Sequence, residues 1–243
     1  MSSLKKDIKD FKVLINNIPS WVVTMFVVSI VCMNLFANKS VNLPVDWLAL
    51  DCGIIFSWMS FLSMDLIVKQ FGAKASIKIT IFSTLISLIV SILFFLGSII
   101  PGSWGASFDF NDAVMVNNAI DATVRGNWYI VFGSTVAFLV AGIVNSLLNE
   151  LIGWMGKKDT YKMFMIRTYV STIIGQFVDN FVFGMIVSRV LFGWSVTQCL
   201  TCAATGALAE LLFEAAFTPL GWKICKSWKK NKIGAAYIEL QDS

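Results

Sequence analysis

The chain has 243 residues, of which 57% are hydrophobic and 14% are charged, and its formal net charge is +4. This composition argues against a soluble domain, in which about a quarter of the residues are charged. The sequence contains no histidine, which argues against Ser-His and Cys-His hydrolases and against His-ligated metal enzymes. We therefore expect a membrane protein that is not an enzyme and has neither a metal site nor a cofactor.

The first 20 residues predict a helix on the cytoplasmic surface of the membrane. Apolar residues recur at helical spacing opposite the lysines, at Leu4, Ile8, Phe11 and Ile15. This pattern is typical of interfacial helices, and Pro19 separates it from the first long apolar segment. A secretory signal peptide is the alternative, but its removal would break the charge alternation described below.

Six apolar segments approach or exceed the ~20 residues that a membrane-spanning helix needs. In chain order they are residues 21–37, 47–68, 77–100, 129–152, 164–190 and 196–222. Strands are not expected inside them, because an open sheet edge has no hydrogen-bond partners in lipid. We predict an all-α bundle of six transmembrane helices, covering residues 21–222, in the cell membrane.

The basic residues give the orientation of the bundle. Sixteen of the nineteen lysines and arginines lie before span one, after span six, or in and beside the loops that join spans two and three and spans four and five. The other three are Lys39, Arg125 and Arg189. Because basic residues collect in cytoplasmic loops, both termini are predicted to be cytoplasmic, with residues 223–243 as a basic tail. The positive charge thus reflects orientation and not nucleic-acid binding.

Residues 101–127 form a long outward-facing loop that is rich in Gly, Ser and Asn. Within it, four apolar residues share one helical face: Ala113, Val116, Ile120 and Val124. Asn111 and Asp112 precede them and can cap a helix start. We predict a short helix here, either as a lid over an outward cavity or as an ordered surface element.

The five cysteines lie in or beside apolar segments, and Cys199 and Cys202 have a redox or zinc spacing. No second pair accompanies them, and their neighbours are small residues. We interpret both as packing residues.

Polar side chains inside the spans are the strongest indication of function. An ionised Asp at mid-membrane costs roughly 2.5–3.5 kcal/mol, and Asp179 has no Lys or Arg at its depth. Gln176 lies one turn before it, and Glu210 lies at a similar depth on span six. Small residues on span six allow close helix approach, so we expect one cavity between spans two, four, five and six.

Four other polar residues are predicted to have structural roles: Asp65, Arg167, Glu214 and Glu150. The last three of them lie nearer the cytoplasmic end. Arg167 is expected to pair with Glu214 or Glu150, because pairing and snorkelling toward water cost little there.

Three segments resemble a known family of transporters. They are FLSMDLIVKQFGAKA (61–75), GSTVAFLVAGIVN (133–145) and STIIGQFVDNFVF (171–183), followed by Thr218-Pro219 at the end of span six. Together they resemble the queuosine-precursor transporter family, also called the vitamin-uptake-transporter or YhhQ-like family. The resemblance runs through spans two to six in order.

The chain also departs from the family pattern at several positions. Trp58 stands where the family usually has Pro, and Gly142 and Asn145 stand where it reads Gln-x-x-Asp. Glu210 lies near the position of a common Lys. These changes alter the charge of the cavity, so either the solute differs or the charges have exchanged places.

The resemblance implies import of a queuosine precursor for tRNA modification: 7-cyano- or 7-aminomethyl-7-deazaguanine, or queuine. One carboxylate can accept both donors of a guanine edge, an amide can donate to O6, and aromatic rings can stack on the base. The substrate-binding residues predicted on this basis are Asp179, Gln176, Asn180, Phe183, Asn145, Asn149, Glu210, Phe61 and Phe138.

The expected partners are this nucleobase-like solute and the lipid bilayer, with a homo-oligomer left open. One alternative is the substrate-capture component of an energy-coupling-factor vitamin transporter. That would require a small-residue docking face on span one for the ATPase module, and residues 21–37 show none. A membrane enzyme is disfavoured by the missing nucleophile–base pair.

Overall fold

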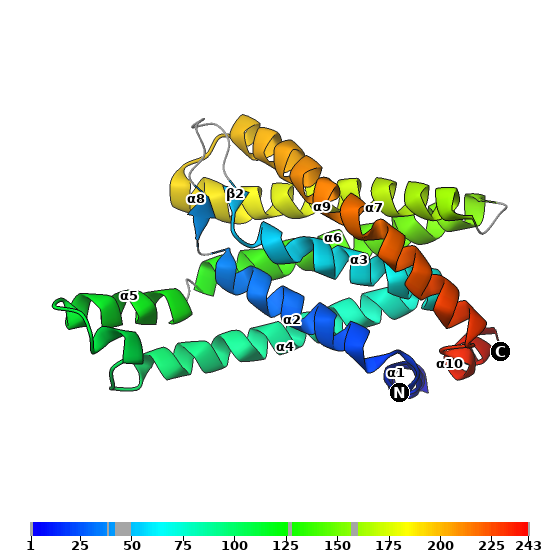
Figure 1. Cartoon of the computed structure of the whole chain (residues 1–243), viewed down its shortest axis with the longest axis horizontal. Coiled ribbons are helices and arrows are strands. Elements are labelled where there is room, and N and C mark those ends of the chain that lie inside the picture. The colour runs from blue at the N-terminus through cyan, green and yellow to red at the C-terminus, as the bar shows by residue number, and fades with distance from the viewer. Residues whose placement is uncertain (1, 38, 42–49, 126–127, 157–159, 243) are drawn as a thin grey trace.

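The computed structural model describes residues 2–37, 39–41, 50–125, 128–156 and 160–242. In this part of the chain the structure is a bundle of long helices (Figure 1). Five helices are long and apolar enough to cross a membrane, or six if the bent pair at the N-terminus forms one span. The predicted all-α membrane bundle is therefore confirmed.

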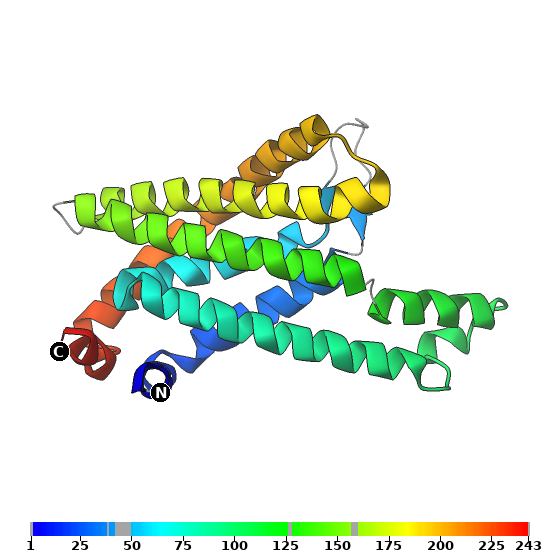
Figure 2. The ribbon, with the colours of Figure 1, turned by 180° about the vertical axis from the view of Figure 1, so that it is seen from behind.

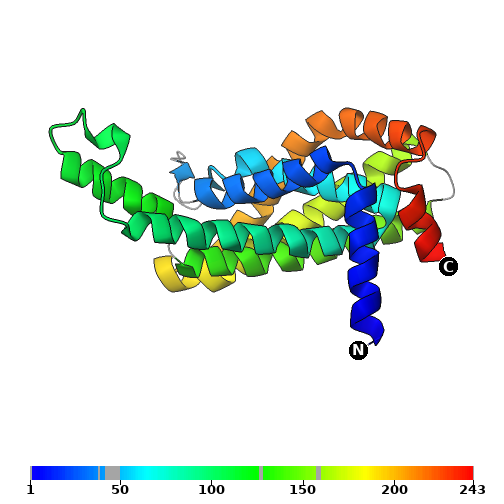
Figure 3. The ribbon, with the colours of Figure 1, turned by 90° about the horizontal axis from the view of Figure 1, so that it is seen from below.

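The chain begins with two helices, α1 (Ser2–Asn17) and α2 (Ser20–Phe36), that meet at a bend of 104°. Pro19 lies at this bend, and a proline disfavours helical geometry in the residue before it. Figure 3 shows α1 leaving the bundle at a steep angle to α2. This geometry suits a helix on the membrane surface, which remains a prediction.

The second predicted span began too early. β1 (Ser40–Val41) and β2 (Leu50–Asp51) form a short antiparallel pair at the end of the bundle, and α3 (Ile54–Phe71) starts only after it. Residues 47–49 lie outside the described part of the chain. Gly53 directly precedes α3, and glycine is a poor helix former, so apolar composition alone misplaced this boundary.

A single residue, Gly72, joins α3 to α4 (Ala73–Ile99) with a φ of 84°. A Cβ atom here would lie 3.0 Å from Glu150 Oε1, so glycine suits both the backbone angle and the close neighbour. The buried face of α4 carries small hydroxyl residues: Ser76, Thr80, Ser83, Thr84 and Ser87. They let α4 pack closely on α6 (Trp128–Met155), where the Ser146 hydroxyl donates to Ser76 Oγ at 2.8 Å.

The loop after α4 contains the predicted helix. A short 3₁₀ turn, η1 (Gly105–Ser107), precedes α5 (Ala113–Arg125). Arg125 Nε donates to Ser98 Oγ at 3.1 Å and ties α5 to the end of α4. No side chain of α5 is buried, and Figure 2 shows α5 projecting beyond the bundle.

Span five is built from α7 (Tyr161–Phe183), a π-helical turn, η2 (Gly184–Ser188), and α8 (Arg189–Phe192). Span six is α9 (Val196–Lys230), which starts with a capping box formed by Ser195 and Gln198. Cys199 is buried, and a Cβ atom on Gly184 would lie 3.2 Å from Cys199 Cβ. Cys199 thus packs where η2 and α9 touch.

The basic tail is largely helical. α9 continues past residue 222 to Lys230, and α10 (Ala235–Asp242) folds back against the bundle. The Tyr237 ring is buried with its centroid 6.2 Å from that of Phe71. Burial, with a smaller contribution from the Asp10 carboxylate, raises the pKa of Tyr237 above its ordinary value.

Both ends of the chain lie at one end of the bundle, where α1 and α10 are in contact (Figure 1). An even number of spans requires this arrangement, while the cytoplasmic location of that end remains a prediction. Large apolar side chains on α4 and α9 point outward and are more than half exposed: Ile89, Ile92, Leu93, Leu208, Leu212 and Leu220. Large apolar side chains exposed in this way suit contact with lipid.

Candidate solute site and inner acidic cluster

Four of the predicted binding residues line one cavity between α2, α3, α6, α7 and α9: Asp179, Asn180, Phe183 and Glu210. The rest of its lining is small or apolar: Met33, Ala37, Gly53, Ile54, Ser57, Ser134 and Ala137. We call this space the outer cavity, because it lies in the half of the bundle away from the chain ends. Its volume of about 50 Å³ has room for a few water molecules. A fused-ring base needs more space, so this conformation is closed.

Small residues on α9 bring it close to α7. The buried face of α9 contains Cys199, Ala203, Gly206 and Ala207, as the sequence predicted. A Cβ atom on Gly206 would lie 2.9 Å from Asn180 Nδ2. Gly206 therefore leaves the space in which the Asn180 amide lies, at the edge of the outer cavity.

The π-helical turn η2 begins directly after Phe183. Such turns insert one extra residue into a helix and are frequent at functional sites. Nothing in the sequence marks this turn, and the sequence analysis did not predict it. It begins next to Phe183, which lines the outer cavity.

Gln176 lies one turn from the outer cavity on α7 and is completely buried. Neither polar atom of its amide has a hydrogen-bond partner within the described residues. A buried polar group left unsatisfied costs about 1–3 kcal/mol. Gln176 is therefore placed to bind a solute or water that reaches this depth.

A second group of polar residues lies deeper in the bundle, and we call it the inner acidic cluster. It consists of five completely buried residues: Asp65, Asn145, Thr168, Thr172 and Glu214. Asn145 Nδ2 donates to Asp65 Oδ1 at 3.0 Å. The Asp65 carboxyl also lies beside Thr168 and Glu214, and the Glu214 carboxyl lies beside Thr172. Asn145, predicted to bind solute, thus lies in this cluster and holds Asp65 in this conformation.

Arg167 was expected to pair with Glu214 or Glu150, and the structure gives it a partner that was not predicted, Asn149. Its Nε donates to Asn149 Oδ1 at 2.6 Å, and Asn149 Nδ2 donates to Ser171 Oγ at 3.2 Å. Both oxygens of Glu214 lack a hydrogen-bond partner in the described part of the chain, so Arg167 and Glu214 form no hydrogen bond there. The close packing of α6 on α7 places Asn149 opposite Arg167, while Glu214 faces α3.

Two further predictions concern residues with structural contacts. Glu150 Oε1 accepts a hydrogen bond from the Ala73 backbone N–H at 2.8 Å, which fixes the turn between α3 and α4. Asn149, predicted to bind solute, uses its amide for Arg167 and Ser171. Both residues thus join helices at the end of the bundle that carries the chain termini.

Phe61 and Phe138 are buried in the hydrophobic core. Their rings pack edge to face with centroids 6.1 Å apart. Neither lines the outer cavity in this conformation. Of the three aromatic residues predicted to stack on a base, only Phe183 faces that space.

The sequence analysis missed the contribution of span one. Met33 and Ala37 from this segment line the outer cavity, together with Ser57 and Ser134. The Ser134 hydroxyl donates to Asn34 Oδ1 at 2.6 Å. An asparagine inside an otherwise apolar span was the signal that could have placed span one at the site.

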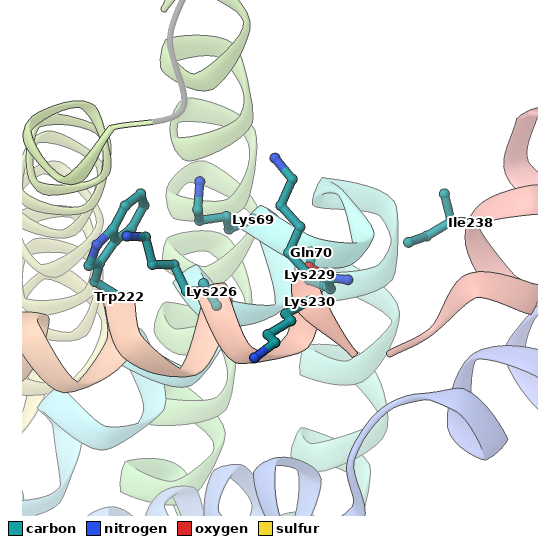
Figure 4. A pocket seen from close by; sticks show the side chains of 8 residues that line it. Lys69, Gln70, Trp222, Lys226, Lys229, Lys230 and Ile238 are labelled. Atoms are coloured by element: carbon teal, nitrogen blue, oxygen red, sulfur yellow. The ribbon is translucent and has the colours of Figure 1, made fainter. Parts of the chain in front are cut away.

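A larger, open cavity of about 720 Å³ lies at the end of the bundle that carries the chain termini (Figure 4). Its lining is basic: Lys69, Lys226, Lys229 and Lys230, with Gln70, Trp222, Cys225 and Ile238. The ammonium groups of Lys69 and Lys226 lie 5.2 and 5.4 Å from the Trp222 ring centroid. None of the predicted solute-binding residues lines this cavity.

A comparison with protein families agrees with this arrangement. Residues 51–223, more than two thirds of the chain, match the family described as "Putative vitamin uptake transporter". The chain belongs to this family. It is thus a membrane protein of a family of uptake transporters, and the matched range includes every residue of the inner acidic cluster. No curated protein and no solved structure matches the chain.

Proposed function

We propose that this family member imports a modified 7-deazaguanine through the outer cavity for use in tRNA modification. The observation that carries the proposal is the convergence of Asp179, Asn180, Phe183 and Glu210 on one cavity between five helices. In a membrane, carboxylates and amides at such a place mark solute pathways more often than anchors. The family match supports uptake in general, and the choice of solute is our inference.

The side chains around the outer cavity fit the chemistry of the base. The Asp179 carboxylate can accept hydrogen bonds from both N1–H and the exocyclic amine of a guanine edge. The Asn180 amide can donate to O6, and the Phe183 ring can stack on the base, worth roughly 1–3 kcal/mol where measured in nucleic-acid binders. Glu210 provides a second carboxylate that would favour a cationic aminomethyl arm.

Binding requires the outer cavity to widen. Its present volume of about 50 Å³ is too small for the solute, so uptake involves at least one more open conformation. Transporters of this kind move helices around a site near the middle of the membrane. The π-helical turn η2 and the close contact between Gly206 and Asn180 make the α7–α9 contact the place where we expect this movement.

We also propose that the protein works by itself in the cell membrane, with both termini in the cytoplasm and the outer cavity in the outward half. A self-sufficient carrier needs only its solute and the bilayer. A substrate-capture subunit would need a partner ATPase module, which we consider the second candidate. Neither version involves nucleic acid, a cofactor or catalysis, and a homo-oligomer is compatible with both.

The test is uptake by proteoliposomes that contain only the purified protein. Labelled 7-cyano-7-deazaguanine is supplied outside, and guanine, the aminomethyl precursor, queuine and queuosine compete in separate assays. We expect saturable uptake that at least one deazaguanine, but not guanine at equal concentration, suppresses. Protein-free liposomes are the control. Binding without transport would favour the capture subunit, and the absence of binding by the whole panel would overturn the proposal.

A further inference from the structure

The inner acidic cluster contains two carboxyl groups that the proposed solute site does not use. Asp65 of α3 and Glu214 of α9 are both completely buried and lie beside one another. Neither residue lines the lysine-lined cavity or the outer cavity. Their burial excludes the water that normally solvates an ionised carboxylate.

Several atoms of this cluster have no hydrogen-bond partner among the described residues: Asp65 Oδ2, both carboxyl oxygens of Glu214, and the hydroxyls of Thr168 and Thr172. These side chains come from three helices and face the same buried region. Native proteins satisfy nearly all buried polar atoms, so a concentration of exceptions needs an explanation. A species bound between the two carboxyl groups would supply part of the missing interactions.

The charges around the two carboxyl groups do not balance. Arg167 of α7 acts electrostatically on Asp65, and Glu210 of α9 acts on Glu214 from one turn away. On α6 the facing residue is the neutral Asn145. Two buried carboxylates beside one guanidinium leave an excess negative charge, which Glu210 does not relieve. Adjacent carboxylates away from water favour binding of one proton between them.

We propose that Asp65 and Glu214 share one proton and that this proton is the ion that drives solute uptake. The inference rests on the proposed transport function. The proton is taken up from the outer side when the bundle opens and is released to the cytoplasm with the solute, so each cycle leaves the cluster unchanged. Glu210 borders both the outer cavity and Glu214, which links solute entry to the charge state of the cluster.

The experiment measures two activities of the same proteoliposomes, using the neutral 7-cyano precursor. Solute counterflow reports carrier movement without a driving ion, whereas accumulation under an inward proton gradient reports coupling. For one proton per solute, with the membrane potential clamped, wild-type protein should accumulate up to about tenfold per pH unit. Addition of solute should also raise the external pH, a readout that requires no variant.

Glu214→Gln and Asp65→Asn should keep counterflow but lose accumulation, with inside and outside concentrations becoming equal. Glu150→Gln is the matched control. Glu150 is a half-buried carboxyl residue whose Oε1 accepts a hydrogen bond from the Ala73 N–H, and an amide oxygen can accept the same bond. It should keep both activities. If a variant does not fold, the change in external pH on addition of solute to wild-type proteoliposomes still decides whether protons move with solute.

Accumulation that follows a sodium gradient and ignores pH would overturn the inference, as would full proton-driven accumulation by both Glu214→Gln and Asp65→Asn. Counterflow in the wild type without any response to a proton gradient defeats the coupling proposal alone. The absence of both counterflow and binding in the wild type defeats the proposed transport function itself. The two failures are therefore distinguishable.

Discussion

The outer cavity and the inner acidic cluster use the same kinds of side chain in different surroundings. Asp179 and Asn180 are only partly buried and line a space that can hold water. Asp65 and Glu214 are sealed among helices. A carboxylate that reaches water remains charged at little cost, whereas a sealed one needs a partner or a proton. In our proposals, depth along the bundle, more than residue type, thus separates a solute ligand from a charge carrier.

The largest expected effect is that of Asp179→Asn on uptake. The change keeps the shape of the side chain but replaces an acceptor by a donor facing the base. Sites built to hydrogen-bond a solute lose far more than a packing contact when this match fails, so uptake should fall by about 100-fold or more. Folded protein, measured by size-exclusion chromatography, should be unchanged. Equal losses of folded protein and uptake would assign Asp179 a structural role and remove the contrast between the two regions.

Glu210→Gln should affect binding of the aminomethyl precursor and of the cyano precursor differently. If Glu210 binds the cationic arm, the change should weaken binding of the aminomethyl precursor by about tenfold, the effect of a partly buried charge pair worth ~1.4 kcal/mol. The neutral cyano precursor should bind as before, and its proton-driven accumulation should persist. Competition binding with both precursors measures this. An equal loss for both, together with lost pH dependence, would move the proton site from the inner acidic cluster to Glu210.

Gly206→Ala should damage the outer cavity through Asn180. The added Cβ would lie 2.9 Å from Asn180 Nδ2 and would displace this amide, so we expect a several-fold loss of solute affinity, of about 1 kcal/mol. Gly221→Ala on the same helix is the matched control. Its Cβ would meet Leu62 Cδ1 at 3.1 Å, far from the cavity lining. Comparable affinity loss in both variants would show that α9 packing in general, and not Asn180, controls binding.

The smallest effect concerns α10. Because burial raises the pKa of Tyr237, the folded state holds the phenolic proton more tightly than the unfolded state. This contribution to stability is present below about pH 10 and is lost as the pH rises through the folded-state value. The Tyr237 hydroxyl has no hydrogen-bond partner within the described residues. Tyr237→Phe should therefore leave the Tm unchanged or up to about 3 °C higher at neutral pH, and it should flatten the alkaline fall of Tm.

A Tm for Tyr237→Phe that is several degrees lower at neutral pH would contradict this expectation. It would indicate that the phenol makes a stabilising hydrogen bond and that α10 contributes more to the bundle than its ring contacts indicate.

Much of the fold could be predicted because lipid imposes simple rules on sequence. Length and apolar content placed the long helices, and the helix at Ala113–Arg125 followed from its apolar spacing. The start of α3 at Ile54 was missed because apolar residues before it, such as Leu50, pair as a strand. The π-helical turn after Phe183 has no sequence signature. Periodicity thus predicts helices well. It predicts neither irregular turns within them nor the short segments that join them.

The candidate site could be predicted only in part, for a related reason. Helical spacing showed that Asp179 and Glu210 face inward at similar depth, and the structure brings both to one cavity. Spacing along one helix says nothing of rotation relative to the next, so the contact between Asn145 and Asp65 was not foreseen. For the same reason, the sequence did not predict that Asp65 and Glu214 lie beside one another, since they come from helices far apart in sequence.

A structure with 7-cyano-7-deazaguanine bound would test the central contrast most directly. We predict that the base lies in a widened outer cavity, with its donor edge on Asp179, its O6 near Asn180 and its ring against Phe183. The inner acidic cluster should remain closed around Asp65 and Glu214. Density for the base against Asp65 and Glu214, or in the lysine-lined cavity beside Trp222, would contradict the assignment of solute and proton to separate regions.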